Sequence, residues 1–590
     1  MNGKAGTARL RASTPGPPAG RRLLLAAAAA ALLACGCRAV APVAAIATVS
    51  PSSSAPARAS LIPGAREARR EGARLERRGV DASVDRYYEA TVRAAAALNT
   101  ATATNPHGGD LDAIRELYNE SLGDCLRAAQ RFGRIDAKSA LVVNGPAGSA
   151  TVPIRHVGFI WKADDFGRLV HPCEVPRNPS AHAPTDFPGL GAGVAVERPN
   201  PRMERQDEFL PRTAVFNATA VLRPDLDAWL GDGPARPPSD VLELYDPLRT
   251  PTVSFGPSPA LPLHADLGLA IARARQIQEA RGPYALAGFA MPERMLAQAD
   301  IRMLEPYQPG KAPILLVHGL LDDPFLFNDM LIALQRTPGF LDRHQLWVFR
   351  YPTGVTFIRS ASILRKQVEK ISATLDPAAV DPAMSGWTLV GYSMGGLLCR
   401  LQVSWSGDAV WDEVATRPLE QLKMSDASRR TVRDLFFFEP SPRIRRVIFI
   451  ATPHDGASPT IAAASWLATR IVQRPADTRQ LVEEVDRANP GVLRPSVRNL
   501  PSSVDALAAY SPLLPAIRKL PYNPAVRLHT IAGTGVHAAD RGRGDLVVPL
   551  SSAHVDEAES EHHVRATHSN IYYQRDTIDE VRRILGFAAP

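Results

Sequence analysis

The sequence Gly-Tyr-Ser-Met-Gly at residues 391–395 constrains the fold of this chain more than any other feature. It has the form G-x-S-x-G, follows the apolar segment 387–390 and precedes a helix-like segment, 396–401. A serine at a sharp strand-to-helix turn needs glycines two residues before and after it, because a Cβ there would collide with neighbouring backbone. Such a pentapeptide also arises by chance, but the strand and helix on either side predict that Ser393 is a catalytic nucleophile.

After residue 312 the sequence alternates between apolar and helix-like segments. The apolar segments are 313–317, 345–350, 387–390, 446–451 and 526–532, and a helix-like segment, 574–586, comes last. This alternation predicts a parallel sheet with helices on both faces. Active sites of such sheets form at the carboxyl ends of the strands. Because the polar motifs of the chain follow these ends, we expect them to converge.

A nucleophilic serine needs a base that accepts its proton. In serine enzymes built on such a sheet, the acid and then the histidine follow the serine in sequence. His568 lies near the C-terminus just before the last helix and is the predicted base, with His563 as the second candidate. His454 follows a strand but precedes the plausible acids, and His529 lies within a strand pattern.

The base needs a carboxylate that orients it. Asp545 follows the fifth apolar segment and enters a loop backed by apolar residues, 546–550, so it is the predicted acid. Asp540 lies in a stretch rich in glycine and arginine that looks exposed, and Asp556 lies in an acidic stretch. Both remain alternatives.

Taken together, these motifs resemble the α/β-hydrolase superfamily. The similarity is greatest to the bacterial lipase and esterase branch, with some likeness to GPI inositol-deacylases. It spans about residues 300–588, and its motifs are at 316–320, 391–396, 451–454, 544–549 and 567–568. The resemblance implies an α/β-hydrolase fold, a mostly parallel sheet with helices on both faces.

The resemblance also implies a role for each site residue. Ser393 would be the nucleophile, Asp545 the acid and His568 the base. The backbone N–H groups of Leu320 and Met394 would form the oxyanion hole, in which one donor is worth ~3–4 kcal/mol.

The chain departs from the family pattern directly after the Leu320 turn. Related sequences have small neutral residues there, whereas this chain has Asp322 and Asp323. Carboxylates near an oxyanion hole oppose the developing negative charge. Either both side chains point to solvent or they tune substrate choice, and we expect them to point to solvent.

The N-terminus has the features of an export signal. Arginines at 21–22 precede the apolar segment 23–33, which is too short to span a bilayer. The sequence 32–35 resembles a bacterial lipobox, which implies lipid attachment at Cys35 and an outer-membrane location. An ordinary secretory signal, with a periplasmic or secreted product, and cleavage nearer Cys37 remain alternatives.

Composition and spacing limit the other function classes. The net charge of +8 comes mostly from arginines scattered among acids, so nucleic-acid binding is not expected. The sequence has no phosphate loop, dinucleotide fingerprint or Cys/His cluster with metal spacing, so neither a cofactor nor a metal is expected. Export permits disulfides, and Cys125 and Cys173 could pair.

The chain divides by composition into a leader, a linker and two folded regions. The expected parts are a signal peptide at 1–34, a disordered tether at 35–80, an N-terminal α+β accessory region of unknown role at 81–300, and a catalytic domain at 301–590 with helical cap insertions near 402–442 and 457–524. The second part is rich in Ala, Pro, Ser and Arg. The insertions contain Trp and Phe residues, which favours either an apolar wall for acyl chains or an ordinary core.

Three functions follow from these features. The first is an exported, lipid-anchored serine hydrolase that cleaves carboxylic esters, such as lipids, through an acyl-serine intermediate. The second is an acyltransferase that uses the same residues, and the third is a catalytically silent binding lipoprotein of the envelope. The complete set of nucleophile, acid, base and oxyanion turn favours the enzymes.

Overall fold

The computed structural model describes two folded regions and parts of the two insertions. The described residues are 60–104, 111–145, 148–176, 182–199, 203–230, 238–256, 260–282, 284–457, 476–495, 507, 511, 513–538 and 542–588. The expected signal peptide, Cys35, Cys37 and Asp540 lie outside them. Within these ranges, no helix is both long and apolar enough to cross a membrane.

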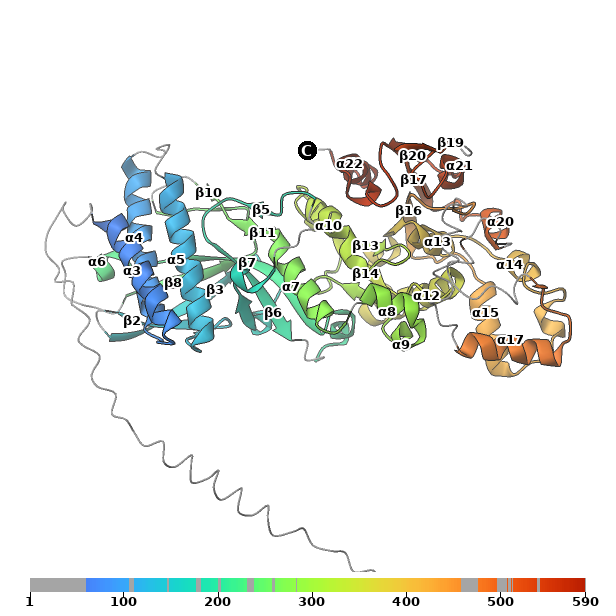
Figure 1. Ribbon diagram of the computed structural model, residues 1–590, viewed down its shortest axis with the longest axis horizontal. Coiled ribbons are helices and arrows are strands. Elements are labelled where there is room, and N and C mark those ends of the chain that lie inside the picture. Colours follow the sequence, from blue (N-terminus) through green and yellow to red (C-terminus); the bar gives the residue numbers. More distant parts are fainter. Residues whose placement is uncertain are drawn as a thin grey trace, which may run out of the picture. The chain divides into compact units, whose positions relative to one another are not determined.

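The C-terminal region is built on a seven-stranded sheet (Figure 1). Its strands are β12 (Asp300–Met303), β13 (Ala312–Val317), β14 (His344–Arg350), β15 (Trp387–Tyr392), β16 (Ile444–Ile450), β17 (Arg527–Gly533) and β20 (Ser560–Val564). Their order is β12-β14-β13-β15-β16-β17-β20, and every pair is parallel except β12 with β14. This strand order is that of the α/β-hydrolase fold, so the predicted fold class is confirmed.

Alternate residues of the central strands pack into different apolar clusters, as the two-residue period of a strand requires. Leu315 and Leu389 belong to the cluster that contains residues of α12 (Phe357–Leu375) and α13 (Met394–Arg400). Ile314, Leu316 and Val390 belong to the cluster that contains residues of α10 (Asn328–Gln335) and α22 (Arg575–Ile584). The strands are apolar on both faces because helices cover both.

The region before residue 300 contains a second seven-stranded sheet. Its order is β1-β2-β3-β8-β7-β6-β4, with strands β1 (Ile135–Asp136), β2 (Ala140–Gly145), β3 (Gly148–Val157), β4 (Arg168–Val170), β6 (Ala192–Pro199), β7 (Thr213–Arg223) and β8 (Val241–Tyr245). One face packs on helices α4 (Ser83–Thr104) and α5 (Leu111–Arg131). Helix α7 (Leu267–Glu279) packs on the other face against β6 and β7. This region is therefore α+β.

The expectation of a disordered tether up to residue 80 is wrong for residues 61–77, which form helix α3 (Leu61–Arg77). Its buried residues are Leu61, Ala65, Ala68, Gly72 and Glu76. They follow one another at spacings of three or four, so they share one face of the helix. That face carries mostly small residues, and the arginines of the segment lie outside it, so the composition is polar although the helix is amphipathic.

The two insertions that the sequence predicts as a cap contact each other. The first contains α14 (Ala409–Asp412) and α15 (Asp426–Phe436), and the second contains α17 (Ala476–Ala488) and α20 (Leu513–Arg518). Ala415 bridges to Leu493 across the two insertions, and Glu484 accepts hydrogen bonds from Ser425 N–H and the Ser428 hydroxyl. The rings of Phe436 and Phe437 contact Trp411 within this cap. These phenylalanines are half-buried and pack against the apolar core cluster.

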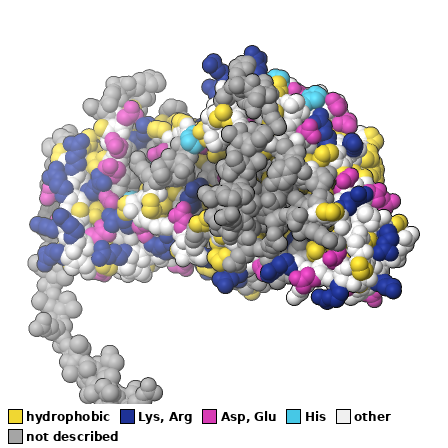
Figure 2. Space-filling model, turned by 45° about the vertical axis from the view of Figure 1, so that its right-hand side comes forward, with side chains coloured by type: hydrophobic (Ala, Val, Ile, Leu, Met, Phe, Trp, Pro, Cys, Tyr) yellow, Lys and Arg dark blue, Asp and Glu magenta, His cyan; other side chains and the backbone are white. Residues whose placement is uncertain are grey.

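The described cysteines are all free thiols. Cys125 is buried in α5, whereas Cys173 is exposed, so the pairing considered from the sequence does not form. Figure 2 shows basic and acidic side chains interspersed over the described part of one face. This pattern agrees with arginines scattered among acids along the chain.

Candidate active site

Ser393 stands at the turn between β15 and α13 in a backbone conformation that is rare for residues other than glycine, with φ 52° and ψ −124°. Glycines make this turn possible. A Cβ on Gly391 would lie 2.6 Å from Gly396 Cα, and a Cβ on Gly395 would lie 2.1 Å from the Val317 carbonyl oxygen. The turn therefore presses against the central strand β13, and Ser393 is held in one position.

Three of the predicted side chains meet at this turn and form a hydrogen-bonded relay. His568 Nε2 lies 2.9 Å from Ser393 Oγ, and His568 Nδ1 lies 2.7 Å from Asp545 Oδ2. Because the carboxylate accepts from Nδ1–H, Nε2 is left to accept the serine proton. The structure thus brings together residues from three separate strand ends.

The relay is held by backbone groups around it. Asp545 is only 1% exposed, and its Oδ1 accepts hydrogen bonds from the N–H groups of Val547 and Val548 at 2.9 and 2.7 Å. The His568 N–H donates to the Asp545 carbonyl at 2.8 Å, and the Tyr392 hydroxyl donates to the His568 carbonyl at 2.7 Å. Asp545 and His568 are therefore fixed relative to each other.

The other candidates make different contacts. His563 lies in β20, exposed, with Nε2 2.7 Å from Glu561, and His529 Nδ1 lies 2.8 Å from the Ser560 hydroxyl. His454 is buried at the end of β16, where its Nδ1 accepts from Arg400 at 3.2 Å. Burial and the Arg400 charge lower the pKa of His454 well below its usual value. Asp556 contacts His554 at 3.1 Å.

The turn after β13 lies directly beside the serine turn, because Gly395 packs against the carbonyls of Val317 and His318. The Tyr351 hydroxyl donates to the His318 carbonyl at 2.7 Å. Burial lowers the pKa of His318 to about 4, so its ring is neutral and its Nδ1 donates to the Gly319 carbonyl at 3.0 Å. Leu320 follows this fixed turn. Met394 is the first residue of α13, which follows β15, the strand beside β13.

Asp322 and Asp323 do not point freely to solvent as expected from the sequence, since both are partly buried. Asp323 Oδ1 accepts from Phe325 N–H at 2.9 Å, and its Oδ2 accepts from Gln278 Nε2 at 3.1 Å. Burial, together with the Asp323 charge, raises the pKa of Asp322 to about 7, while His568 acts in the opposite direction. The position of the Asp323 side chain could not be predicted from the sequence, because its donor, Gln278, is distant in sequence.

Asp322 gives the protein a predictable pH dependence. The folded state holds a proton up to about pH 7 that the unfolded state, with a carboxyl pKa near ~4, has already released. The free energy of unfolding therefore falls as pH rises between about 4 and 7. We expect Asp322→Asn to be more stable than wild type at pH 8 by ~1–2 kcal/mol, after allowance for solvent screening, and equally stable at pH 4.

Thermal melts at the two pH values measure this difference, with Asp556→Asn, an exposed carboxylate, as the control. The control should change the melting temperature equally little at both. A stability gain of the same size at pH 4 and pH 8 would contradict the ionisation of a buried Asp322.

Two exposed leucines border the relay, each in a left-handed backbone conformation. Leu321 (φ 64°) follows the Leu320 turn and is 47% exposed, and Leu546 (φ 84°) follows Asp545 and is 55% exposed. A leucine at positive φ costs about 1–2 kcal/mol relative to glycine. The chain therefore keeps large, exposed apolar side chains next in sequence to Leu320 and Asp545, at positions where glycine would be less strained.

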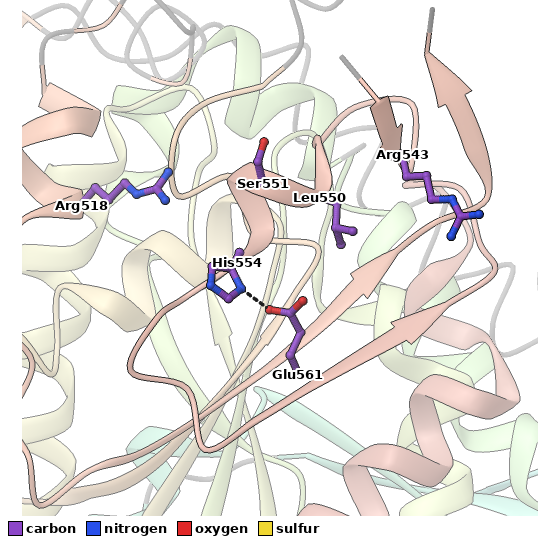
Figure 3. Close-up of a pocket in the computed structure, with 6 residues that line it drawn as sticks. All are labelled: Arg518, Arg543, Leu550, Ser551, His554 and Glu561. Atoms are coloured by element: carbon purple, nitrogen blue, oxygen red, sulfur yellow. Dashed lines mark hydrogen bonds and ion pairs between the residues drawn. The ribbon is translucent and has the colours of Figure 1, made fainter.

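A surface depression of about 480 Å³ lies beside α21 (Leu550–Ala553), which follows the Asp545 loop (Figure 3). Its lining residues are Arg518, Arg543, Leu550, Ser551, His554 and Glu561. His554 Nδ1 and Glu561 Oε2 are 2.5 Å apart and face each other in this view. The lining contains no relay residue. In the part of the chain that the structure describes, no three His, Cys, Asp or Glu residues are arranged to hold a metal ion.

The fold and the relay together define a protein of the α/β-hydrolase fold with a serine, a histidine and an aspartate in hydrogen-bond contact. No protein-family model matches the chain. It is 28% identical over 88 residues to the lysosomal thioesterase PPT2-B of Xenopus laevis, which is 15% of this chain and 28% of that protein. The chain thus matches less than a third of that relative's length.

Similar solved structures carry lipase and esterase names. The mature lipase BlEst2 of Bacillus licheniformis is 17% identical, with 47% of this chain and 93% of that chain covered and a TM-score of 0.29. A lipase-esterase related protein of Clostridium acetobutylicum is 12% identical, with 46% and 93% covered and a TM-score of 0.25.

Proposed function

We propose that this protein is a serine hydrolase that cleaves carboxylic esters through an acyl-serine intermediate. The observation that carries the proposal is the relay, in which His568 lies 2.9 Å from Ser393 Oγ and 2.7 Å from Asp545. A serine hydroxyl is a weak nucleophile unless an adjacent base removes its proton, and this arrangement supplies that base.

Each step uses one group of the site. Ser393 Oγ attacks the ester carbonyl while His568 Nε2 takes the serine proton, and Asp545 stabilises the imidazolium that forms. The N–H groups of Leu320 and Met394 bind the tetrahedral oxyanion. His568 then protonates the leaving alcohol, which departs and leaves acyl-Ser393. Water, activated by the same histidine, releases the acid.

The exposed leucines favour an apolar acyl group. Leu321 and Leu546 are adjacent in sequence to Leu320 and Asp545, so a chain bound to the acylated serine would extend over apolar surface. Each CH₂ removed from water contributes about 0.8 kcal/mol. The substrate class is therefore an ester with a medium or long acyl chain.

A panel of p-nitrophenyl esters of increasing chain length tests both parts of this proposal. We expect wild type to release the free acid and to prefer long chains over acetyl. In Leu546→Gly, kcat/KM for a dodecanoyl ester should fall about tenfold while the acetyl ester is unaffected, because only the long chain reaches the lost side chain.

The matched control is Ala379→Gly, which also places glycine at a positive φ (52°) but lies outside the site. It should leave the whole panel unchanged. Equal losses on acetyl and dodecanoyl esters in Leu546→Gly would contradict the assignment of acyl contact. Transfer of the acyl group to an added alcohol in place of release as free acid would identify an acyltransferase.

We also propose that the chain is exported and anchored by lipid at Cys35, with the outer membrane as its location. The support is the arginine pair, the short apolar segment 23–33 and the lipobox-like sequence 32–35. Incorporation of a fatty-acid analogue into wild type but not into Cys35→Ser tests the anchor, and an unlabelled wild-type chain would contradict it.

A further inference from the structure

The turn after β13 that contains Leu320 is called the oxyanion turn below. Residues that precede the hydrolase sheet contact the segment that follows this turn. Gln278, on α7, donates through Nε2 to Asp323 Oδ2 at 3.1 Å. Arg275, on the same helix, places its guanidinium 5.2 Å from the centre of the Phe325 ring. Asp323 also begins the 3₁₀ helix η4 (Pro324–Phe327) by accepting from Phe325 N–H. Helix α7 therefore holds the chain three to five residues beyond Leu320.

A second helix of the accessory region supports the oxyanion turn through the loop that follows β14. Helix α8 (Tyr284–Ala290) meets the loop after β14, where Gly354 N–H donates to the Gly288 carbonyl at 3.0 Å. A Cβ on Gly354 would lie 2.1 Å from the Phe289 carbonyl oxygen, so the approach requires glycine. In that loop, Thr353 Oγ1 accepts from Leu321 N–H at 3.2 Å. The contact thus reaches the oxyanion turn through Thr353.

A third contact lies on the histidine side of the site. The His182 ring stacks on Tyr573 with centroids 3.6 Å apart. Tyr573 contacts Tyr572, and Tyr572 contacts Tyr392, with centroids 5.1 Å apart in both pairs. Tyr392 donates to the His568 carbonyl. A continuous series of aromatic rings therefore connects the accessory region to the loop that carries the base.

We infer that the accessory region is an integral part of the active site, in which Gln278 positions the oxyanion turn and His182 positions the His568 loop. The inference rests on the proposed function. Neither residue touches the reacting atoms, so both are positioning residues. Support from outside matters here because Leu321 is held in a strained conformation on an exposed turn. Displacement of a catalytic group by about 1 Å lowers a rate by up to ~100-fold.

The test uses point variants of the full chain. Gln278→Met keeps the side-chain length but removes the donor to Asp323. We expect kcat on a short ester to fall about tenfold with KM within about twofold, because the oxyanion donors act in the transition state. Gln278→Lys restores a donor and should recover most of the rate. His182→Ala should slow fluorophosphonate labelling of Ser393 about fivefold.

The matched control is Lys370→Met. Lys370 pairs with Glu208 at 2.5 Å, an exposed contact between the same two regions. The Lys370→Met variant should have unchanged kcat. A wild-type kcat in Gln278→Met together with a wild-type labelling rate in His182→Ala would overturn the inference. Losses that match those of Lys370→Met and follow the melting temperature would also overturn it. An active wild type with unaffected variants refutes this inference alone, whereas an inactive, unlabelled wild type refutes the proposed function and this inference with it.

Discussion

Replacing Ser393 by alanine is expected to lower kcat for ester hydrolysis by about 10⁴–10⁶-fold with no change in fold. The same loss is expected for His568→Ala, because without a base at 2.9 Å the serine hydroxyl stays protonated. Asp545→Asn keeps the shape of the site but favours the wrong tautomer of His568, which in a comparable triad lowers kcat by about 10⁴. Steady-state kinetics measure kcat of each variant, and circular dichroism checks that its fold is unchanged.

The control for this series is His563→Ala. His563 was the second candidate for the base, and it lies exposed on β20, bonded to Glu561. Its replacement should leave kcat unchanged. Full activity in Ser393→Ala, or a loss in His563→Ala as large as in His568→Ala, would show that the relay is not the catalytic group.

The second large effect is expected from Gly395→Ala, which should prevent stable folding or lower the free energy of unfolding by more than about 4 kcal/mol. The added Cβ would lie 2.1 Å from the Val317 oxygen and 2.5 Å from the His318 oxygen. Both are backbone atoms at the end of the central strand β13. They cannot move away without displacing the sheet or the oxyanion turn.

Gly386→Ala is the matched control, because its Cβ would meet no atom closer than 3.4 Å. Chemical denaturation should place this variant within about 1 kcal/mol of wild type. Gly395→Ala with a wild-type midpoint and full activity would contradict the close packing of the serine turn on β13.

The sequence was sufficient to predict the relay and most of the central sheet. Ser393 follows an apolar strand, Asp545 lies in the loop after another, and His568 precedes the last helix; their order along the chain restricts the choice. Two outer strands were missed for a physical reason. β20 reads Ser-Glu-His-His-Val, and β12 contains Asp300 and Arg302. Edge strands face solvent on one side and lack the apolar pattern of central strands.

The support around the relay could not be predicted, because it depends on partners distant in sequence. Gln278 and Asp323 are separated by 45 positions, and their contact exists only once both regions have folded. The same holds for His182 and Tyr573. The position of the Asp323 side chain follows from its contact with Gln278, so local sequence favoured the opposite expectation.

Fluorophosphonate labelling of the purified protein, with the modified residue located by mass spectrometry, tests directly whether Ser393 is an activated nucleophile. A serine activated by a neighbouring base reacts with such a probe, whereas an ordinary serine does not. We predict one adduct, at Ser393, which disappears in His568→Ala. Absence of an adduct on folded wild-type protein, or an adduct on a different serine, would contradict this prediction.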